Sequence, residues 1–301
     1  MRFWLMGGFI VAFPFTLLLL FLLFLEGGSA PKPPRMPAQN GYDDLLDAGK
    51  KVQWNDYTEL DQKGLQGFVE ANANALQLAR DGFQKESRVP VQYSQNYLTN
   101  HIEDFTFTKR LAHAFAAEGR LAEMEGRTND AANAYLDIVR LGNDSVRGGM
   151  LIDELVGIAI ESMGVARLEK LVPSLDRHVS EGAASTLEAI DLQAQTIDDV
   201  MKQENVFFHA IYQGWRYDLL RRQSRKSIEP AIQKAKEKAN AETKKRRQLT
   251  LDLAVHAYEV DKGRLPASAV DLVPDYLKAV PKDPATDAEM EMVEPRNAPR
   301  K

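Results

Sequence analysis

The chain has 301 residues, of which 44% are hydrophobic and 27% are charged, and its net charge is -5. This is an ordinary globular composition, with enough chain for one large domain or two modest ones, and the net charge indicates no particular partner. The chain has no cysteine, which excludes disulfides, zinc–cysteine sites, iron–sulfur clusters and thiol chemistry.

Residues 3–25 contain no charged side chain. As a helix this stretch is about 34 Å long, enough to cross a bilayer. We therefore expect a transmembrane anchor over residues 1–25, a single-pass protein of the inner (cytoplasmic) membrane, and an extracytoplasmic body. A cleaved signal peptide is the alternative, but its apolar core is usually about 7–15 residues long, and Pro31 follows the best cleavage site. Residues 26–40, rich in proline, glycine and alanine, are expected to form a tether.

Apolar residues recur near every 3.6 positions through residues 41–222, and no alternating strand pattern of useful length appears. The fold is therefore predicted to be mostly α. The stretch 148–172 is apolar nearly all round, which is typical of a buried helix. Gly149, Asp153, Gly157 and Gly164 fall roughly on one face of this helix, where glycines allow another backbone to approach closely.

Two helices, predicted over 102–125 and 129–141, are separated by Gly126. Their small and aromatic residues resemble those of a tetratricopeptide (TPR-like) hairpin. The residues that carry this likeness are Phe115, Gly119, Gly126, Ala131 and Tyr135. No second copy recurs at a period of about 34 residues, so a generic antiparallel helix pair stays open as the alternative.

Further helices are predicted over 58–83, with Thr58 as the N-cap, and over 182–200, continuing through 204–222. Aromatic and aliphatic side chains crowd the last of these. We expect them to pack on the central helix; the alternative is an exposed patch for a partner. These residues are Phe207, Phe208, Ile211, Tyr212, Trp215, Tyr217 and Leu219.

A basic stretch, 221–247, carries eleven lysines and arginines against three glutamates. Because large apolar residues are few, residues 223–248 are predicted to be a solvated helix or a mobile connector. A solvated face or a site for an acidic partner is favoured over nucleic acid, because no base-stacking aromatics are interleaved; anionic lipid is a further candidate ligand. The candidate basic surface comprises Arg221, Arg222, Arg225, Lys226, Lys244, Lys245, Arg246 and Arg247.

Residues 249–284 form a helix followed by a proline-punctuated segment, with Gly263 as the predicted helix C-cap and Ser268 capping a short turn. This pattern resembles the segment after the long helix of the major pseudopilins of type II secretion. The chain departs from that family because residues 285–301 are only a polar tail, with no room for its β-sheet, and no prepilin processing site is present. The resemblance implies a shared packing module and no secretion function by itself.

Other stretches match uncharacterised membrane-anchored helical proteins of planctomycete bacteria, and this resemblance covers nearly all of the soluble chain. It implies no activity. The stretches that carry it are Asn40-Gly41-Tyr42-Asp43, Arg88-Val89-Pro90-Val91-Gln92-Tyr93-Ser94 and the first ten residues from Gly148.

No cofactor motif is present, and none of the five histidines stands in a metal-binding pair. The one constellation is a candidate buried polar pair, Asp153 and Glu161 on the central helix, which could act as acid–base groups or metal ligands. The alternative is pairing with arginine, for which Arg110, Arg120 and Arg147 are available. We therefore predict no cofactor and no metal.

The leading functional hypothesis is a membrane-tethered, non-enzymatic scaffold or protein-interaction module of the cell envelope. The alternatives are an accessory component of a type II secretion or pilus-like system, and an unrecognised hydrolase that uses Asp153 and Glu161.

Overall fold

The computed structural model describes residues 35–211 and 215–292, without the side chains of 215–228. This part of the chain is mostly helical, as predicted, and holds no strand, only an isolated antiparallel bridge between Lys282 and Glu289. The α-helices are α2 (Gly41–Lys51), α3 (Gln62–Gly82), α4 (Tyr97–Met124), α5 (Thr128–Asp144), α6 (Leu151–Leu171), α7 (Arg177–Gln193), α8 (Ile197–Ile211) and α9 (Trp215–Lys262). Two short 3₁₀ helices are η1 (Val172–Ser174) and η2 (Ala269–Leu272).

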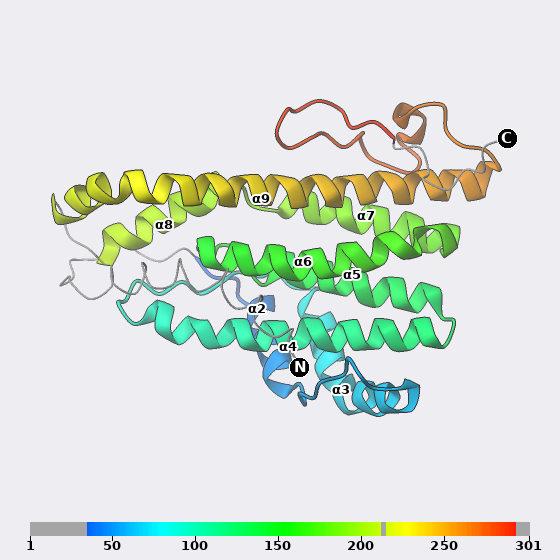
Figure 1. The fold of residues 1–301 in the computed structure, drawn as a ribbon, viewed down its shortest axis with the longest axis horizontal. Helices are drawn as coiled ribbons and strands as arrows, with labels where there is room; N and C mark the ends of the chain where they lie inside the picture. Colours follow the sequence, from blue (N-terminus) through cyan, green and yellow to red (C-terminus); the bar gives the residue numbers. More distant parts are fainter. Residues whose placement is uncertain (1–34, 212–214, 293–301) are drawn as a thin grey trace, which may run out of the picture.

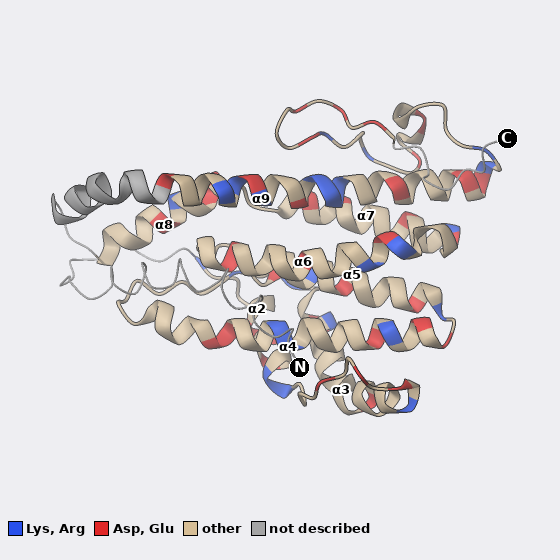
Figure 2. Ribbon diagram, in the orientation of Figure 1, with Lys and Arg blue, Asp and Glu red and all other residues tan. Residues whose placement is uncertain are grey.

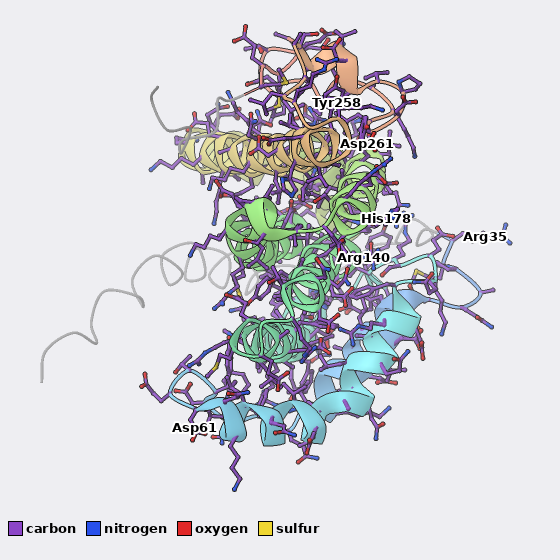
Figure 3. All side chains as sticks on the ribbon, turned by 90° about the vertical axis from the view of Figure 1, so that its right-hand side faces the viewer. Arg35, Asp61, Arg140, His178, Tyr258 and Asp261 are labelled. Carbon is purple, nitrogen blue, oxygen red and sulfur yellow. The ribbon has the colours of Figure 1, made fainter. Side chains whose placement is uncertain are left out.

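The helices are stacked in a column in which each one packs on its neighbours (Figure 1). The contacts run from α2 and α3 to α4, then to α5 and α6, and from there to α7 and α9. Figure 3 views this column from the side, turned by 90° from Figure 1, with Asp61 at the bottom and Tyr258 and Asp261 at the top. Such an arrangement is that of stacked helical hairpins, with contacts mainly between adjacent members.

The backbones of α5 and α6 approach closely, and glycines make this possible. A Cβ atom on Gly157 would lie 2.5 Å from the carbonyl oxygen of Gly142, and one on Gly164 would lie 2.6 Å from the carbonyl oxygen of Tyr135. On the predicted glycine face of the central helix, α5 therefore covers Gly157 and Gly164.

The expectation that this helix is buried nearly all round is wrong, because Ala159 and Ala166 are exposed. Asp153 of the predicted glycine face contacts α4 and not α5. The predicted helical hairpin over 102–141 is also present, as α4 and α5, and Gly126 in its turn has a φ of 72°.

Several predicted helix limits are wrong, including the start of α4, which lies at Tyr97 and not at residue 102. The N-cap of α3 is Asp61, whose carboxylate accepts a hydrogen bond from the Gly64 N–H, whereas Thr58 is held in a turn by Asp56. The helix predicted over 182–200 starts earlier, at Arg177, and stops at Gln193, so that residues 194–196 separate α7 from α8. Within the segment 194–196, the Gln195 side chain accepts a hydrogen bond from the Gly148 N–H and donates one to the Val146 carbonyl. These bonds attach the segment between α7 and α8 to the α5–α6 loop.

The basic stretch and the helix after it form one continuous helix, α9, so the predicted boundary at 248/249 lies inside it. The second half of α9 packs in the main core through Leu249, Leu253 and Ala257. As predicted, α9 ends at Gly263, whose φ is 67°, and Ser268 caps η2. The proline-punctuated segment folds back on α9 (Figure 1) and buries Leu272, Tyr276 and Leu277. The stretch predicted as a polar tail is not wholly solvent-exposed, because Met290 is buried in the same core.

The predicted membrane anchor over residues 3–25 lies outside the described residues. Within residues 35–211 and 215–292, no helix has both the length and the apolar character that a bilayer crossing needs.

A second, smaller apolar core lies where α8 meets the N-terminal ends of α4 and α6. Phe207 and Ile211 of α8 are buried there against Tyr97 of α4 and Met150 at the start of α6. The aromatic stretch of α8 therefore packs on the central helix, as expected. Tyr212, Trp215, Tyr217 and Leu219 lie outside the side chains that the structure describes.

We predict that Gly157→Ala lowers the free energy of unfolding by about 2 kcal/mol, because its methyl group forces α5 and α6 apart and this outweighs the better helix propensity of alanine. The matched control is Gly67→Ala on α3, where an added Cβ meets no atom within 4 Å and should stabilise by up to about 1 kcal/mol. Urea denaturation followed by circular dichroism measures both, and an equal effect of the two substitutions would contradict the close contact.

Candidate functional site

Asp153 and Glu161, the candidate buried polar pair, both lie on α6 and are both buried, with exposures of 0% and 7%. They do not pair with each other: each has its closest ionic partner on a different helix. Asp153 contacts His101 of α4, and Glu161 contacts Arg246 of α9. The structure thus contains two polar centres on α6, which we call the His101 centre and the Arg246 centre.

In the His101 centre, both nitrogens of one imidazole contact carboxylates. Nδ1 lies 2.9 Å from Oδ2 of Asp104, and Nε2 lies 2.5 Å from Oδ1 of Asp153. The Tyr42 hydroxyl, from α2, donates a hydrogen bond of 3.0 Å to the same Asp104 oxygen. The Tyr97 ring stacks on the imidazole, with their centroids 4.9 Å apart. The centre therefore links α2, α4 and α6 at one point.

The charge of this centre follows from its contacts. Burial alone lowers the pKa of His101, but the hydrogen bonds and charges of Asp104 and Asp153 outweigh it and raise that pKa to about 9. His101 is therefore an imidazolium at neutral pH, held between two carboxylates. Burial, and the nearby Asp104 and Asp153, raise the pKa of Tyr42 far above its ordinary range, so its hydroxyl remains a hydrogen-bond donor.

Asp153 also caps its own helix. Its Oδ2 atom accepts a hydrogen bond of 2.7 Å from the N–H of Met150, and the next N–H, that of Leu151, donates to Oε2 of Glu204 on α8 at 2.9 Å. The first N–H groups of a helix have no intrahelical acceptor, so these carboxylates satisfy donors that would otherwise be buried without a partner. Asp153 has a structural role at both of its oxygens.

Segments far apart in sequence converge on the His101 centre. Asn40 accepts a hydrogen bond from the N–H of Arg88 through its side-chain oxygen and donates its amide to the Arg88 carbonyl, both at 2.8 Å. The Val89 N–H donates to the Arg147 carbonyl at 2.8 Å, and Val89 shares a core with Met150. The stretches 40–43, 88–94 and 148–157 therefore meet in space. His101 lies in none of them, and a lone histidine in a helix gave no signal of its role.

In the Arg246 centre, a buried guanidinium bridges two acidic side chains. Arg246 is 3% exposed and donates to Glu161 at 2.5 Å and to Asp191 of α7 at 2.8 Å. Arg247 binds the second oxygen of Asp191 at 2.9 Å. This centre fastens α9 to α6 and α7.

These contacts correct the predicted basic surface. Arg246 is not on the surface, and Arg247 is engaged by Asp191 and by the carbonyl of Lys282. Lys244 contacts Asp283 at 2.7 Å, and Lys245, an exposed residue, contacts Glu242 on its own helix at 2.8 Å. Figure 2 shows that the described part of α9 mixes both signs of charge. The other predicted members, Arg221, Arg222, Arg225 and Lys226, lie outside the described side chains.

None of the three arginines proposed as partners for the carboxylates serves that purpose. Arg120 donates to the carbonyl oxygens of Tyr57, Thr58 and Leu60, where it holds the α2–α3 connection. Arg110 lies over the Phe107 ring, and Arg147 donates to the Gln193 side chain. Only the tertiary fold supplies the actual partners, His101 and Arg246.

Among the described residues, no group of three or more His, Asp or Glu side chains is arranged to hold a metal ion. An open, polar hollow with a volume of about 370 Å³ lies between the α4–α5 turn and the α6–α7 connection. It is remote in sequence from both centres; its walls are formed by residues 126–130 together with Ser174 and Asp176. Both polar centres are closed by their own partners, and this favours a role in holding helices together.

Comparisons of this chain with protein-family models, with curated proteins and with solved structures found no match.

We predict that His101→Phe lowers the free energy of unfolding by about 3 kcal/mol at pH 6, because it leaves Asp153 as a buried charge without a cation. The pKa of His101 is raised from 6.5 to about 9, so its stabilising effect is complete below pH 6.5 and declines as the pH rises through 9. The difference in stability between wild type and variant should therefore narrow as the pH rises from 6.5 to 9 and change little above that. Urea denaturation at several pH values measures this, and a constant difference would exclude a charged His101.

We also predict that Arg246→Met destabilises by about 3–5 kcal/mol, because Glu161 and Asp191 lose the cation between them. Lys245→Met, one residue away, should cost less than about 1 kcal/mol, since its ion pair is exposed. In the double variant Arg246→Met/Glu161→Leu, most of the stability should return. Thermal denaturation compares the three variants, and equal losses at positions 245 and 246 would refute the buried bridge.

Proposed function

We propose that the helical body is a protein-interaction scaffold, tethered to the cytoplasmic membrane through residues 3–25 and exposed on the extracytoplasmic side. The observation that carries this proposal is the open column of helices, whose polar interior groups bind one another. Stacked helical hairpins offer a long surface relative to their volume, and proteins of this architecture commonly use that surface to bind other proteins.

Several large apolar side chains lie on the outside of the column. They are dispersed over the loop after α2, the end of α4, the end of α7 and the C-terminal region, and are not gathered into one cleft. Single exposed side chains of this kind are ordinary on protein surfaces, so they serve as positions for probing a partner and not as evidence of one. The most exposed are Trp54, Met124, Leu192, Val260, Leu265 and Val270.

A second candidate is an accessory role in a type II secretion or pilus-like system. What favours it is the packing of the pseudopilin-like segment as a unit on the end of α9, where the Tyr258 and Tyr276 rings lie 5.4 Å apart and the Tyr276 hydroxyl donates to Asp261. Co-purification with a pseudopilin or a secretion ATPase would support it. The hydrolase alternative has less support, because Asp153 and Glu161 are both engaged by other side chains.

The scaffold proposal predicts discrete protein adducts when a photoreactive amino acid replaces Leu192, Val260 or Val270, one at a time, in intact cells. Position 67 on the outer face of α3 is the control, because a side chain there meets no atom of the chain. Adducts of one mass at any of these positions, absent at position 67, would support a docking surface there. The absence of adducts at every position, together with loss of the cellular phenotype in a folded Asp153→Asn variant, would favour the enzyme.

The tether and its orientation are tested with a membrane-impermeant maleimide, since the chain has no cysteine of its own. A single cysteine at Ala241, exposed on α9, should react in intact cells or spheroplasts if the body is extracytoplasmic. Ala257→Cys, buried in the same helix, should react only after denaturation. Protection of the cysteine at 241 until lysis would place the body in the cytoplasm and overturn the orientation.

A further inference from the structure

The joint between α6 and α8 contains a carboxylate that the two polar centres do not use. Glu204 projects from α8 to the N-terminus of α6, where its Oε2 atom accepts the Leu151 N–H at 2.9 Å. On the same side of α8, Phe207 is fully buried against the core that contains Met150 and Tyr97. Glu204 therefore sits beside the apolar contact that docks α8.

The surroundings of Glu204 do not favour its ionised form. No cation contacts its carboxylate in the described part of the chain, and the nearby charge on α6 is that of Asp153, which repels it. Burial is the largest cause, and with Asp153 it outweighs the hydrogen bond from Leu151 and raises the pKa of Glu204 from 4.5 to about 7.

Most of the ionisable groups around the joint have other partners. The His101 imidazolium lies between Asp104 and Asp153, and Lys236 of α9 pairs with Asp198 at the first turn of α8. Glu154 of α6 accepts from Gln195 at 3.2 Å; its burial, together with the charge of Glu161, raises its pKa to about 6.

The Tyr97 hydroxyl is buried without a hydrogen-bond partner among the described residues. Burial and the nearby Asp153 and Asp104 raise its pKa far above the ordinary range, so it stays neutral. Ionisable groups on the elements around the joint include Tyr42, Arg88, Tyr93, Tyr97, His101, Asp104, Asp153, Glu154 and Lys236.

We propose that the α6–α8 joint is a proton-sensitive latch, which holds α8 against the N-terminus of α6 while Glu204 is protonated and releases it when Glu204 is ionised. A protonated Glu204 keeps its oxygen on the Leu151 N–H at little electrostatic cost. An ionised Glu204 gains free energy by moving into water, and α8 moves with it. Release uncovers Phe207 and Met150, so that an apolar surface is exposed on the body as the pH rises.

The direction of the pH effect follows from the linkage between the protonation of Glu204 and the docking of α8. The folded-state pKa of Glu204 lies above its ordinary value, so docking is strongest below pH 4.5 and weakens as the pH rises to 7 and beyond. If Glu204 recovers an ordinary pKa when α8 is released, the opening equilibrium of α8 grows roughly 70-fold between pH 5 and pH 8.

Hydrogen exchange of the full chain, read by mass spectrometry and corrected for the intrinsic effect of pH, measures this opening. Amides of α8 should exchange on the order of fifty times faster at pH 8 than at pH 5, while amides of α5 serve as the internal reference for global unfolding. In Glu204→Gln, which keeps an oxygen for Leu151, the pH effect on α8 should fall below tenfold. Glu169→Gln, at an exposed position of α6, is the matched control and should follow the wild type.

Two results would overturn the latch. One is an α8 exchange rate in the wild-type chain that does not change with pH relative to α5. The other is a Glu204→Gln variant whose α8 amides keep the wild-type pH dependence.

Discussion

The central helix carries carboxylates inside an apolar core, and this constraint organises the rest of the molecule. An unpaired charge at such a depth would cost several kcal/mol, so each carboxylate needs a cation from elsewhere in the chain. Asp153 takes His101 from α4, and Glu161 takes Arg246 from α9. Because these partners come from opposite sides of α6, the two ion pairs specify which helices flank it, whereas apolar packing alone would accept more than one arrangement.

Glycine contacts complete this specification. The α5 and α6 backbones meet at Gly142 and Gly157, where no side chain keeps them apart, so that α5 is fixed on the remaining face of α6. Three helices thus contact α6 in three different ways: α4 through an imidazolium, α9 through a guanidinium and α5 through its backbone. The column extends from this helix in both directions, towards α2 and α3 on one side and towards α9 and the C-terminal segment on the other.

The same polar groups bear on function. A catalytic centre needs at least one reactive group that a substrate can reach, whereas the carboxylates of both centres bind side chains of other helices and, for Asp153, the end of α6. Much of the basic stretch behaves similarly, since Lys244, Arg246 and Arg247 bind acidic groups of the chain itself. Its positive charge holds α9 to the body, and less of it is left for an external polyanion. Glu204 differs from these groups, because within the described part of the chain no cation contacts it.

The sequence by itself determined the helical class, the hairpin of α4 and α5, the close glycine contact at Gly157 and Gly164 of α6, and the end of α9 at Gly263. These follow from local rules: the period of apolar residues, the left-handed backbone that glycine allows, and capping side chains. The partners of Asp153 and Glu161, the burial of Arg246 and the continuity of α9 were decided only by the tertiary structure. A pairing between residues 52 or 85 positions apart leaves no periodic trace in the chain, and an arginine in a basic run looks solvent-exposed until another helix is placed against it.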